Sequence, residues 1–248
     1  MTLEQFFAEN REVAIAFSGG VDSAYLLYAA KRYAARVKAY YVSTAFQPEF
    51  ELEDARRLAA DVGADMLVLH VDVLSNSAVT ANPSDRCYHC KNTLFRQILR
   101  AAENDGFPVL LDGTNASDDA GDRPGMRALR ELSVRSPLRE CGLTKAEIRR
   151  LSREAGLFTW DKPAYACLAT RIRTGEEITL QKLKQTEKAE GFLFGLGFRD
   201  FRVRMVDNTA KLELRETDLP LLLENREKIV TELRKDYDSV LLNLEVRK

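Results

Sequence analysis

The sequence predicts an α/β protein with a doubly wound parallel sheet, followed by a small C-terminal α+β domain. Two observations support this. Strand-like and helix-like segments alternate from the start of the chain to about Phe158, which is typical of parallel strands covered by helices on both faces. After the loop-like stretch TWDKPAYACLATRIRTG, the pattern changes to a helix, two adjoining strands, a helix and a last strand. We expect domains over residues 1–170 and 171–248.

The first domain should begin with a short buried strand. Its clearest helix lies over LTKAEIRRLSREAG, because Thr144 and Glu147 form a capping box and Gly156 provides a stop signal. The other expected elements of this domain are strands over 13–17, 37–43, 65–71 and 109–112, and helices over 22–36, 50–62 and 87–105.

The second domain is expected to place a hairpin between two helices. Its two middle strands, FRVRMV and KLELR, alternate in polarity, and the segment DNTA between them favours a turn. The flanking helices are expected over residues 176–196 and 220–237, and SVLLNLEV forms the last strand.

Composition restricts the class of protein. A net charge of −1, with 45% apolar and 30% charged residues, is ordinary for a globular chain and does not favour a strongly basic nucleic-acid binder. The N-terminal segment lacks the basic and apolar regions of a signal peptide, and no apolar run is long enough to span a membrane. We therefore expect a cytoplasmic protein whose four cysteines do not form structural disulfides.

The segment SGGVDS, residues 18–23, joins the first predicted strand to the first predicted helix. Glycines permit the sharp turn, and the N–H groups of a helix N-terminus favour a bound anion. Ser18 and Ser23 add hydroxyl donors, while Asp22 can orient the loop or help hold a magnesium ion on the phosphates. A plain strand-to-helix turn with an Asp-Ser cap is the alternative. The complete motif in this context favours a phosphate site, although it is neither a Walker A loop nor a G-x-G-x-x-G fingerprint.

The same segment resembles the loop of the PP-loop ATP pyrophosphatases, which cleave ATP to AMP and pyrophosphate and adenylate a substrate. The resemblance implies an adenine nucleotide alpha hydrolase-like fold, with ATP and Mg²⁺ as cofactors. The segment LLDGTNASD also resembles a later strand end of that family, where Gly113 and Thr114 would approach the nucleotide. The residues implied to hold pyrophosphate are Ser18, Gly19, Gly20, Asp22 and Ser23.

Nearly the whole chain resembles the LarE family of ATP-dependent sulfur transferases. The resemblance is carried by DRCYHCK, GDRPGMRAL, VRSPLRECGLTKAEIRRLSREAGLFTWDKPAYACLATRIRTG and RVRMVDNTAKLEL. It implies adenylation of a carboxylate of pyridinium-3,5-dicarboxylate mononucleotide and replacement of AMP by sulfur, in the biosynthesis of the nickel-pincer nucleotide cofactor. Adenylation makes a carboxylate reactive, because AMP is a far better leaving group than oxide. The family also implies a homo-oligomer.

Three cysteines are candidates for sulfur delivery. Cys87 and Cys90 form a C-x-x-C, and positions i and i+3 share one face of a helix, so both thiolates can meet one metal centre. In one form of the LarE family, a single cysteine at the position of Cys167 gives up its own sulfur. This chain resembles the three-cysteine form, which implies a [4Fe–4S] cluster with one open iron. A zinc site, or unligated or redox thiols, are the alternatives.

Charged residues near the second domain are candidates for substrate binding. Arg202 and Arg204 alternate along one predicted strand, so both face the same side and can bind the substrate phosphate. An exposed basic edge strand is the alternative. The resemblance implies that Arg171 contacts substrate or AMP phosphate, and it places Glu190 and Glu213 near the substrate, although a solvated face also explains these two acids.

Other functions compatible with the phosphate loop make different demands on the sequence. A PP-loop tRNA 2-thiolation enzyme would need an RNA-binding surface, which the net charge does not favour. An amidating synthetase would need neither the three cysteines nor the Arg-x-Arg strand. A nucleotide-binding metal sensor would bind ATP without releasing AMP. We therefore expect the pyridinium mononucleotide as partner, and neither nucleic acid nor a membrane.

Overall fold

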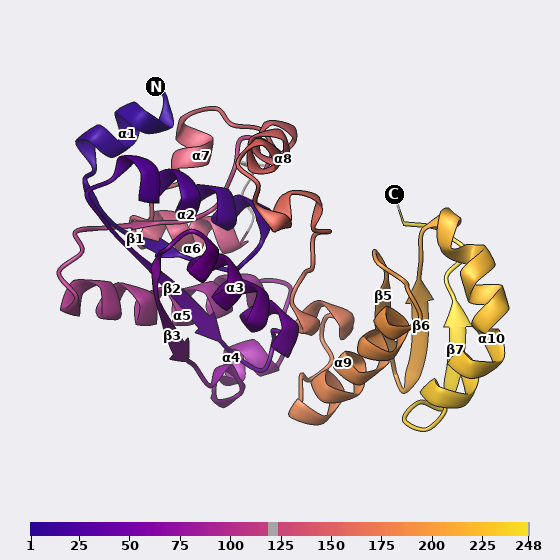
Figure 1. Ribbon diagram of the computed structural model, residues 1–248. Coiled ribbons are helices and arrows are strands. Elements are labelled where there is room, and N and C mark those ends of the chain that lie inside the picture. The colour runs from indigo at the N-terminus through magenta and orange to yellow at the C-terminus, as the bar shows by residue number, and fades with distance from the viewer. Residues whose placement is uncertain (119–123, 248) are drawn as a thin grey trace. The chain divides into compact units, whose positions relative to one another are not determined.

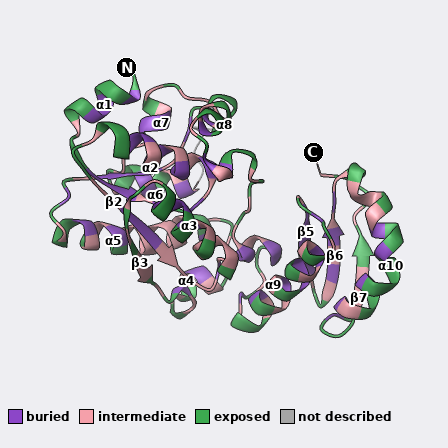
Figure 2. Ribbon diagram, in the orientation of Figure 1, coloured by how far each residue is buried: buried purple, intermediate pink, exposed green. Residues whose placement is uncertain are grey.

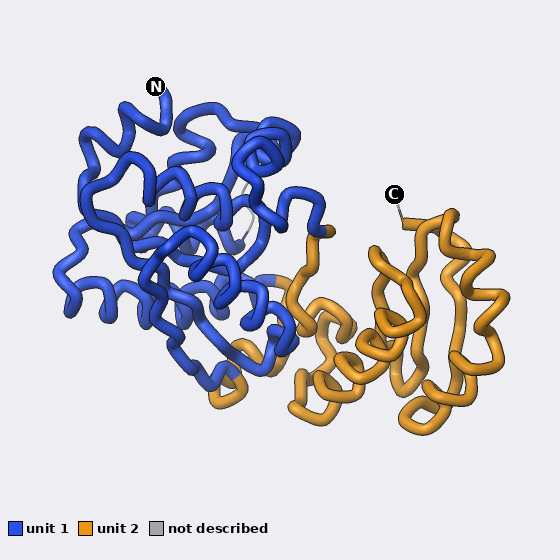
Figure 3. Tube along the Cα trace, viewed as in Figure 1, with its two compact units in different colours: residues 1–73, 85–162 blue, residues 74–84, 163–248 orange. Residues whose placement is uncertain are grey.

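The chain folds into two compact units, which are described separately. The structure is a computed structural model that describes residues 1–118 and 124–247 (Figure 1). Unit 1 comprises Met1–Val73 and Asp85–Lys162, and unit 2 comprises Leu74–Ser84 and Pro163–Lys248 (Figure 3). The expected domain boundary after residue 170 stays a prediction. Across the described ranges, no helix is long and apolar enough to cross a membrane.

Unit 1 is built on a four-stranded parallel sheet in the order β3-β2-β1-β4. The chain proceeds outward from β1 to β2 and β3, and then returns to the other side of β1 to form β4. The carboxyl ends of β1 and β4 therefore flank the point where the strand order reverses, which is where ligands bind in open α/β sheets. The strands are β1 (Glu12–Ala16), β2 (Arg36–Ser43), β3 (Asp65–His70) and β4 (Val109–Leu111).

Helices cover both faces of this sheet because its strands are apolar on both sides. Val13 and Ile15 of β1 lie in a core formed with α1, α2, α3 and α8, whereas Ala14 lies in a second core with Ile98 and Ala102 of α5 (Figure 2). The predicted doubly wound α/β fold is confirmed. The helices of unit 1 are α1 (Leu3–Glu9), α2 (Val21–Tyr33), α3 (Glu49–Asp61), α5 (Arg86–Asn104), α6 (Pro124–Glu131), α7 (Pro137–Glu140) and α8 (Lys145–Glu154).

Two helix starts in unit 1 are fixed by capping boxes. The predicted box at Thr144 and Glu147 is present at the start of α8. A second box, between Thr2 and Gln5, starts α1, a helix that was not expected from the sequence. In each box the threonine hydroxyl accepts a bond from a first-turn N–H, while the Glu or Gln side chain accepts one from the cap N–H.

Unit 2 contains a three-stranded sheet in the order β5-β6-β7, with β5 and β6 antiparallel and β6 and β7 parallel. Val203 and Leu212 on one face of the sheet pack with Leu193 of α9 and Ile229 of α10. The first helix starts later than residue 176, because the Thr179 side chain caps it. The elements of unit 2 are α4 (Ser77–Thr80), α9 (Leu180–Gly195), β5 (Arg202–Val206), β6 (Thr209–Glu213), α10 (Leu219–Leu233) and β7 (Ser239–Leu242).

Residues 74–84 belong to unit 2 although unit 1 surrounds them in sequence. Asn82 is fully buried at φ 53°, and its side-chain amide donates to the Arg173 carbonyl at 2.8 Å. Its own carbonyl accepts from the Gly175 N–H at 2.8 Å, and the Thr80 carbonyl accepts from the Ile178 N–H. The segment is thus fastened to the chain that follows Cys167.

Candidate functional site

The loop of residues 18–23 lies between β1 and α2 and is held in shape by its own hydroxyls. The Ser18 N–H donates to Ser23 Oγ at 3.2 Å, and Ser23 Oγ donates to the Gly20 carbonyl at 3.1 Å. Gly19 has φ 73°, and a Cβ there would lie 3.2 Å from that of Ala55 on α3. Gly20 begins α2 without a side-chain cap. The first turn of α2 therefore offers its N–H groups and its positive dipole end to an anion.

The end of β4 lies directly against this loop. A Cβ on Gly113 would be only 2.9 Å from the Ser23 backbone nitrogen, so the two segments approach as closely as glycine allows. Thr114 is fixed by its neighbour Asp112, which accepts from the Thr114 hydroxyl and, at 2.6 Å, from the Ser136 hydroxyl. The structure thus brings together the two segments that were predicted from the sequence to bind ATP.

Two further residues reach the loop that the sequence pattern did not single out. Lys145, the first residue of α8, forms an ion pair through Nζ with Asp22 Oδ2. The side-chain amide of Asn115, a residue only 2% exposed, donates to the other Asp22 oxygen at 3.3 Å. The capping box at Thr144 marks where α8 starts, but sequence spacing does not reveal that this start faces Asp22.

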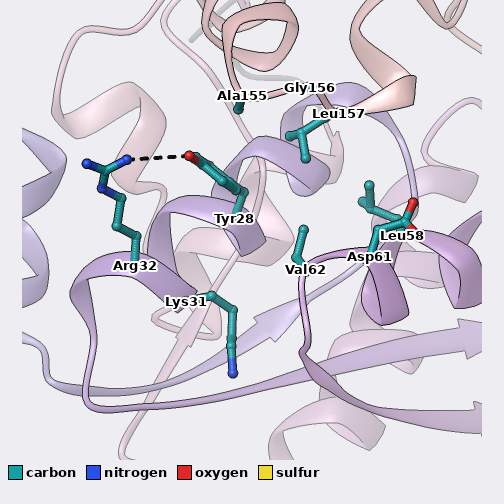
Figure 4. A pocket seen from close by; sticks show the side chains of 9 residues that line it. All are labelled: Tyr28, Lys31, Arg32, Leu58, Asp61, Val62, Ala155, Gly156 and Leu157. Carbon is teal, nitrogen blue, oxygen red and sulfur yellow. Dashed lines mark hydrogen bonds between the residues drawn. The ribbon is translucent and has the colours of Figure 1, made fainter.

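A separate hollow of about 490 Å³ lies in unit 1 at the opposite end of α2 (Figure 4). It is formed by the C-terminal ends of α2, α3 and α8, where exposed carbonyl groups and the helix dipoles disfavour anions. The loop, unlike this hollow, lies at a helix N-terminus, whose N–H groups favour an anion. The lining residues are Tyr28, Lys31, Arg32, Leu58, Asp61, Val62, Ala155, Gly156 and Leu157.

Cys87 and Cys90 lie one turn apart at the start of α5 in unit 1, with Cys87 exposed and Cys90 half-buried. Cys167 belongs to unit 2. All four cysteines lie in the described part of the chain, and none forms a disulfide. Cys141 packs against the core of unit 1, and burial raises the pKa of its thiol. Within residues 1–118 and 124–247, no three His, Cys, Asp or Glu side chains lie together as a metal ion requires.

Cys167 precedes a short 3₁₀ helix, Leu168–Arg171, in which Arg171 is buried against Glu190 of α9. Their bidentate pair joins Arg171 Nε to Oε1 at 2.8 Å and Nη2 to Oε2 at 3.1 Å. Burial alone would lower the pKa of Arg171, but the hydrogen bond and charge of Glu190 raise it above its usual value. Arg171 is therefore a permanent cation beside Cys167.

Arg202 and Arg204 of β5 extend toward the same part of unit 2. Arg202 donates to the carbonyls of Phe201, at 2.6 Å, and Ala164. Arg204 pairs through Nε with Glu213 Oε1 at 2.8 Å and donates to the Thr170 carbonyl. All five charged residues predicted to bind substrate thus lie in unit 2, and contact of each with a substrate stays a prediction.

This cluster carries more positive charge than its acids neutralise. Burial, and then the charges of Arg171 and Arg247, lower the pKa of Arg202. Arg247 shares Asp200 with Arg202, at 3.1 and 3.8 Å respectively. An anion near these guanidinium groups would relieve their mutual repulsion.

Comparison with known proteins identifies relatives of this chain. The asparagine synthase family model matches residues 4–118, which include the loop and β4. The pyridinium-3,5-bisthiocarboxylic acid mononucleotide synthase of Lactiplantibacillus plantarum is 32% identical over 217 residues, which cover 87% of this chain and 79% of that protein. An uncharacterised protein of Synechocystis sp. is 40% identical over 86% of this chain and 80% of its own, and one of Methanocaldococcus jannaschii is 31% identical over 96% and 91%. The chain belongs to the LarE family of PP-loop proteins and is an ATP-dependent sulfur transferase.

Proposed function

We propose that this enzyme adenylates the carboxylates of pyridinium-3,5-dicarboxylate mononucleotide and converts them to thiocarboxylates, as a step in nickel-pincer nucleotide cofactor biosynthesis. A carboxylate oxygen attacks the α-phosphate of ATP, pyrophosphate leaves, and an acyl-adenylate forms. A sulfur nucleophile then attacks the acyl carbon and AMP leaves. The observation that carries the proposal is the pair Arg202 and Arg204, whose guanidinium groups lie beside the chain around Cys167 and suit a substrate with a phosphate and two carboxylates.

The residues of the loop would hold the pyrophosphate part of ATP. Ser18 and Ser23 supply hydroxyls, and Gly19 and Gly20 let the backbone N–H groups approach the phosphates. Asp22 would help hold Mg²⁺ on the phosphates, since carboxylate oxygens are ligands that this ion prefers. Gly113 and Thr114 would approach the nucleotide from the end of β4. In this arrangement Lys145, which pairs with Asp22, would come close to the same phosphates.

Substrate would bind in unit 2. Arg202 and Arg204 are proposed to bind its phosphate, and Arg204 is the more accessible of the two, with 39% of its side chain exposed. Glu213 holds Arg204 in place through their ion pair. Arg171 and Glu190 are proposed to complete this region, close to Cys167. We expect the working enzyme to be a homo-oligomer in the cytoplasm.

We also propose that Cys87, Cys90 and Cys167 hold a [4Fe–4S] cluster. The donor set fits, because three soft thiolates suit iron–sulfur chemistry and two of them share one face of α5. A cluster held by three cysteines keeps one iron open for an external sulfur ligand. Without a cluster, Cys167 itself is the sulfur donor.

The test is anaerobic purification followed by measurement of iron, sulfide and the visible spectrum. We expect about four irons per chain, lost in Cys167→Ala and kept in Cys141→Ala, the matched cysteine control. A colourless protein after reconstitution would eliminate the cluster. A Cys167 mass loss of about 34 Da after turnover, one H₂S, would then identify the sacrificial route.

Activity is followed by mass spectrometry with the pyridinium dicarboxylate mononucleotide, MgATP and sulfide. The proposal expects AMP and a thiocarboxylate in equal amounts, with a second sulfur added on longer incubation. If AMP forms only with ammonia and the product is an amide, the enzyme is an amidating synthetase. If sulfur appears only in added tRNA, it is a tRNA thiolation enzyme.

A further inference from the structure

Three arginines hold main-chain carbonyls of the Cys167 segment, defined as residues 164–171. Arg202 donates to the carbonyl of Ala164, and Arg204 donates to that of Thr170. Arg171 Nη1 donates to the carbonyl of Ala166 at 2.8 Å. The chain on both sides of Cys167 is therefore held by two side chains from β5 and by Arg171 of the segment's own 3₁₀ helix.

Protein groups occupy the hydrogen-bond acceptor positions of the Glu190 carboxylate. Its Oε1 accepts from Arg171 Nε and, at 2.9 Å, from the Val203 N–H of β5. Its Oε2 accepts from Arg171 Nη2 and from the Tyr165 hydroxyl. A carboxylate offers about four acceptor positions, so these bonds satisfy it. With 1% of its side chain exposed, Glu190 is placed to hold protein groups and not a ligand.

Arg171 links Glu190 to the segment. Its side chain is 0% exposed, and its guanidinium lies 4.7 Å from the centre of the Tyr165 ring. One edge of the guanidinium faces Glu190, while Nη1 faces the Ala166 carbonyl and, at 2.9 Å, the Thr170 hydroxyl. The planar fork thus connects α9 to the main chain directly before Cys167.

We propose that Arg171 and Glu190 are positioning residues, which fix the Cys167 segment for sulfur transfer rather than contact substrate. The proposal rests on the proposed function and refines the role that the resemblance implied for both residues. Sulfur transfer needs the sulfur and the acyl carbon in one geometry, and small misplacements of a reacting group are costly. In this proposal adenylation depends on the loop of unit 1 and on Arg202 and Arg204, so it should be far less sensitive to this pair than sulfur transfer is.

The test uses a double variant, Arg171→Met with Glu190→Met, which removes both charges together. Removing one partner would leave a buried charge, whereas apolar replacement of a whole pair is often neutral for folding. Arg171→Lys is the second variant: it keeps a cation beside Glu190 but loses the fork that reaches Ala166. Lys188→Ala, on the same helix α9 as Glu190, is the control, because it breaks only an exposed ion pair with Asp236.

Hydrogen–deuterium exchange of the peptide around residues 163–173 measures the positioning directly and needs no substrate. Because charge-assisted hydrogen bonds shift an opening equilibrium by about tenfold or more, we expect exchange at least about tenfold faster in the double variant. Arg171→Lys is expected to fall between this value and wild type, and Lys188→Ala to match wild type. Exchange within about twofold of wild type in both Arg171 variants would overturn the proposal.

Kinetics separates positioning from substrate contact. We expect thiocarboxylate formation to lose about tenfold in kcat, with the KM for the mononucleotide and ATP–pyrophosphate exchange within about twofold of wild type. A parallel loss of both activities, with a raised KM, would show that the pair binds substrate and would refute positioning. If wild-type enzyme makes no thiocarboxylate, the proposed function fails, while deuterium exchange still decides whether the pair fixes the segment.

Discussion

Replacing Gly113 by alanine tests whether the ends of β1 and β4 form one ATP site. The new Cβ would lie 2.9 Å from the Ser23 nitrogen and 3.2 Å from its Cα, whereas ordinary contact begins at 3.4 Å. Both neighbours are backbone atoms, so β4 and the start of α2 must separate by about 0.5 Å. Overpacking of this kind costs about 1–3 kcal/mol. If the cost falls on the ATP-bound state, the Kd for ATP rises about 5- to 150-fold.

The assay is calorimetric titration of Gly113→Ala with MgATP, together with its thermal midpoint. Gly191→Ala is the matched control, because Gly191 lies within α9 and a Cβ there meets nothing within 4 Å. The control is expected to bind ATP normally and to gain slightly in stability, since alanine favours helix. ATP binding by Gly113→Ala within twofold of wild type, with an unchanged midpoint, would refute the reasoning about this contact.

Three other outcomes follow from the geometry of unit 1. Lys145→Met removes the cation that pairs with Asp22. Because the pair is partly exposed, we expect ATP binding to weaken by about 1 kcal/mol, seen as a rise of about fivefold in the KM for ATP. An unchanged KM would show that Lys145 is not part of the site. Thr144→Ala removes the cap of α8 and should cost about 1 kcal/mol, seen as a thermal shift of about 2–4 °C. Hydrogen bonds, above all the one from Lys38, hold the pKa of Asp105 below its usual value of 3.8. The ionised Asp105 carboxylate therefore stabilises the fold above pH 3.8, and this stabilisation is lost as the pH falls through the lowered pKa. Asp105→Asn should therefore lower the urea midpoint at pH 7 and match wild type in strong acid, and a constant difference across this pH range would contradict the assignment.

Local patterns were sufficient to predict most of the fold. Strands of unit 1 are short apolar runs bounded by turn residues, and the capping box at Thr144 marked the start of α8 correctly. The same signal, Thr2 followed three positions later by Gln5, marks the start of α1. The predicted start of α9 near residue 176 was early, because the N-cap Thr179 outweighs the helix-forming residues before it.

The site was less predictable because its key contacts join residues far apart in sequence. The motif SGGVDS indicated a phosphate loop, but nothing local indicates that Lys145 pairs with Asp22 across 123 positions. Likewise, Arg171 and Glu190 were identified as charged residues, whereas their complete burial as a pair depends on how α9 packs. Periodicity reports which face of a helix is apolar, and it does not report which charges meet inside the protein.

The assignment of residues 74–84 to unit 2 also determines which fragments of this enzyme can fold on their own. A fragment ending at Lys162 would contain all of β1–β4 but would still carry residues 74–84, whose partners at Arg173 and Gly175 would be missing. Asn82 would then be exposed to water without the hydrogen bonds that hold it at φ 53°. During synthesis on the ribosome, residues 74–84 cannot form their native hydrogen bonds until residue 178 has been made. A minimal nucleotide-binding fragment would therefore need residues 74–84 replaced by a short glycine-rich link.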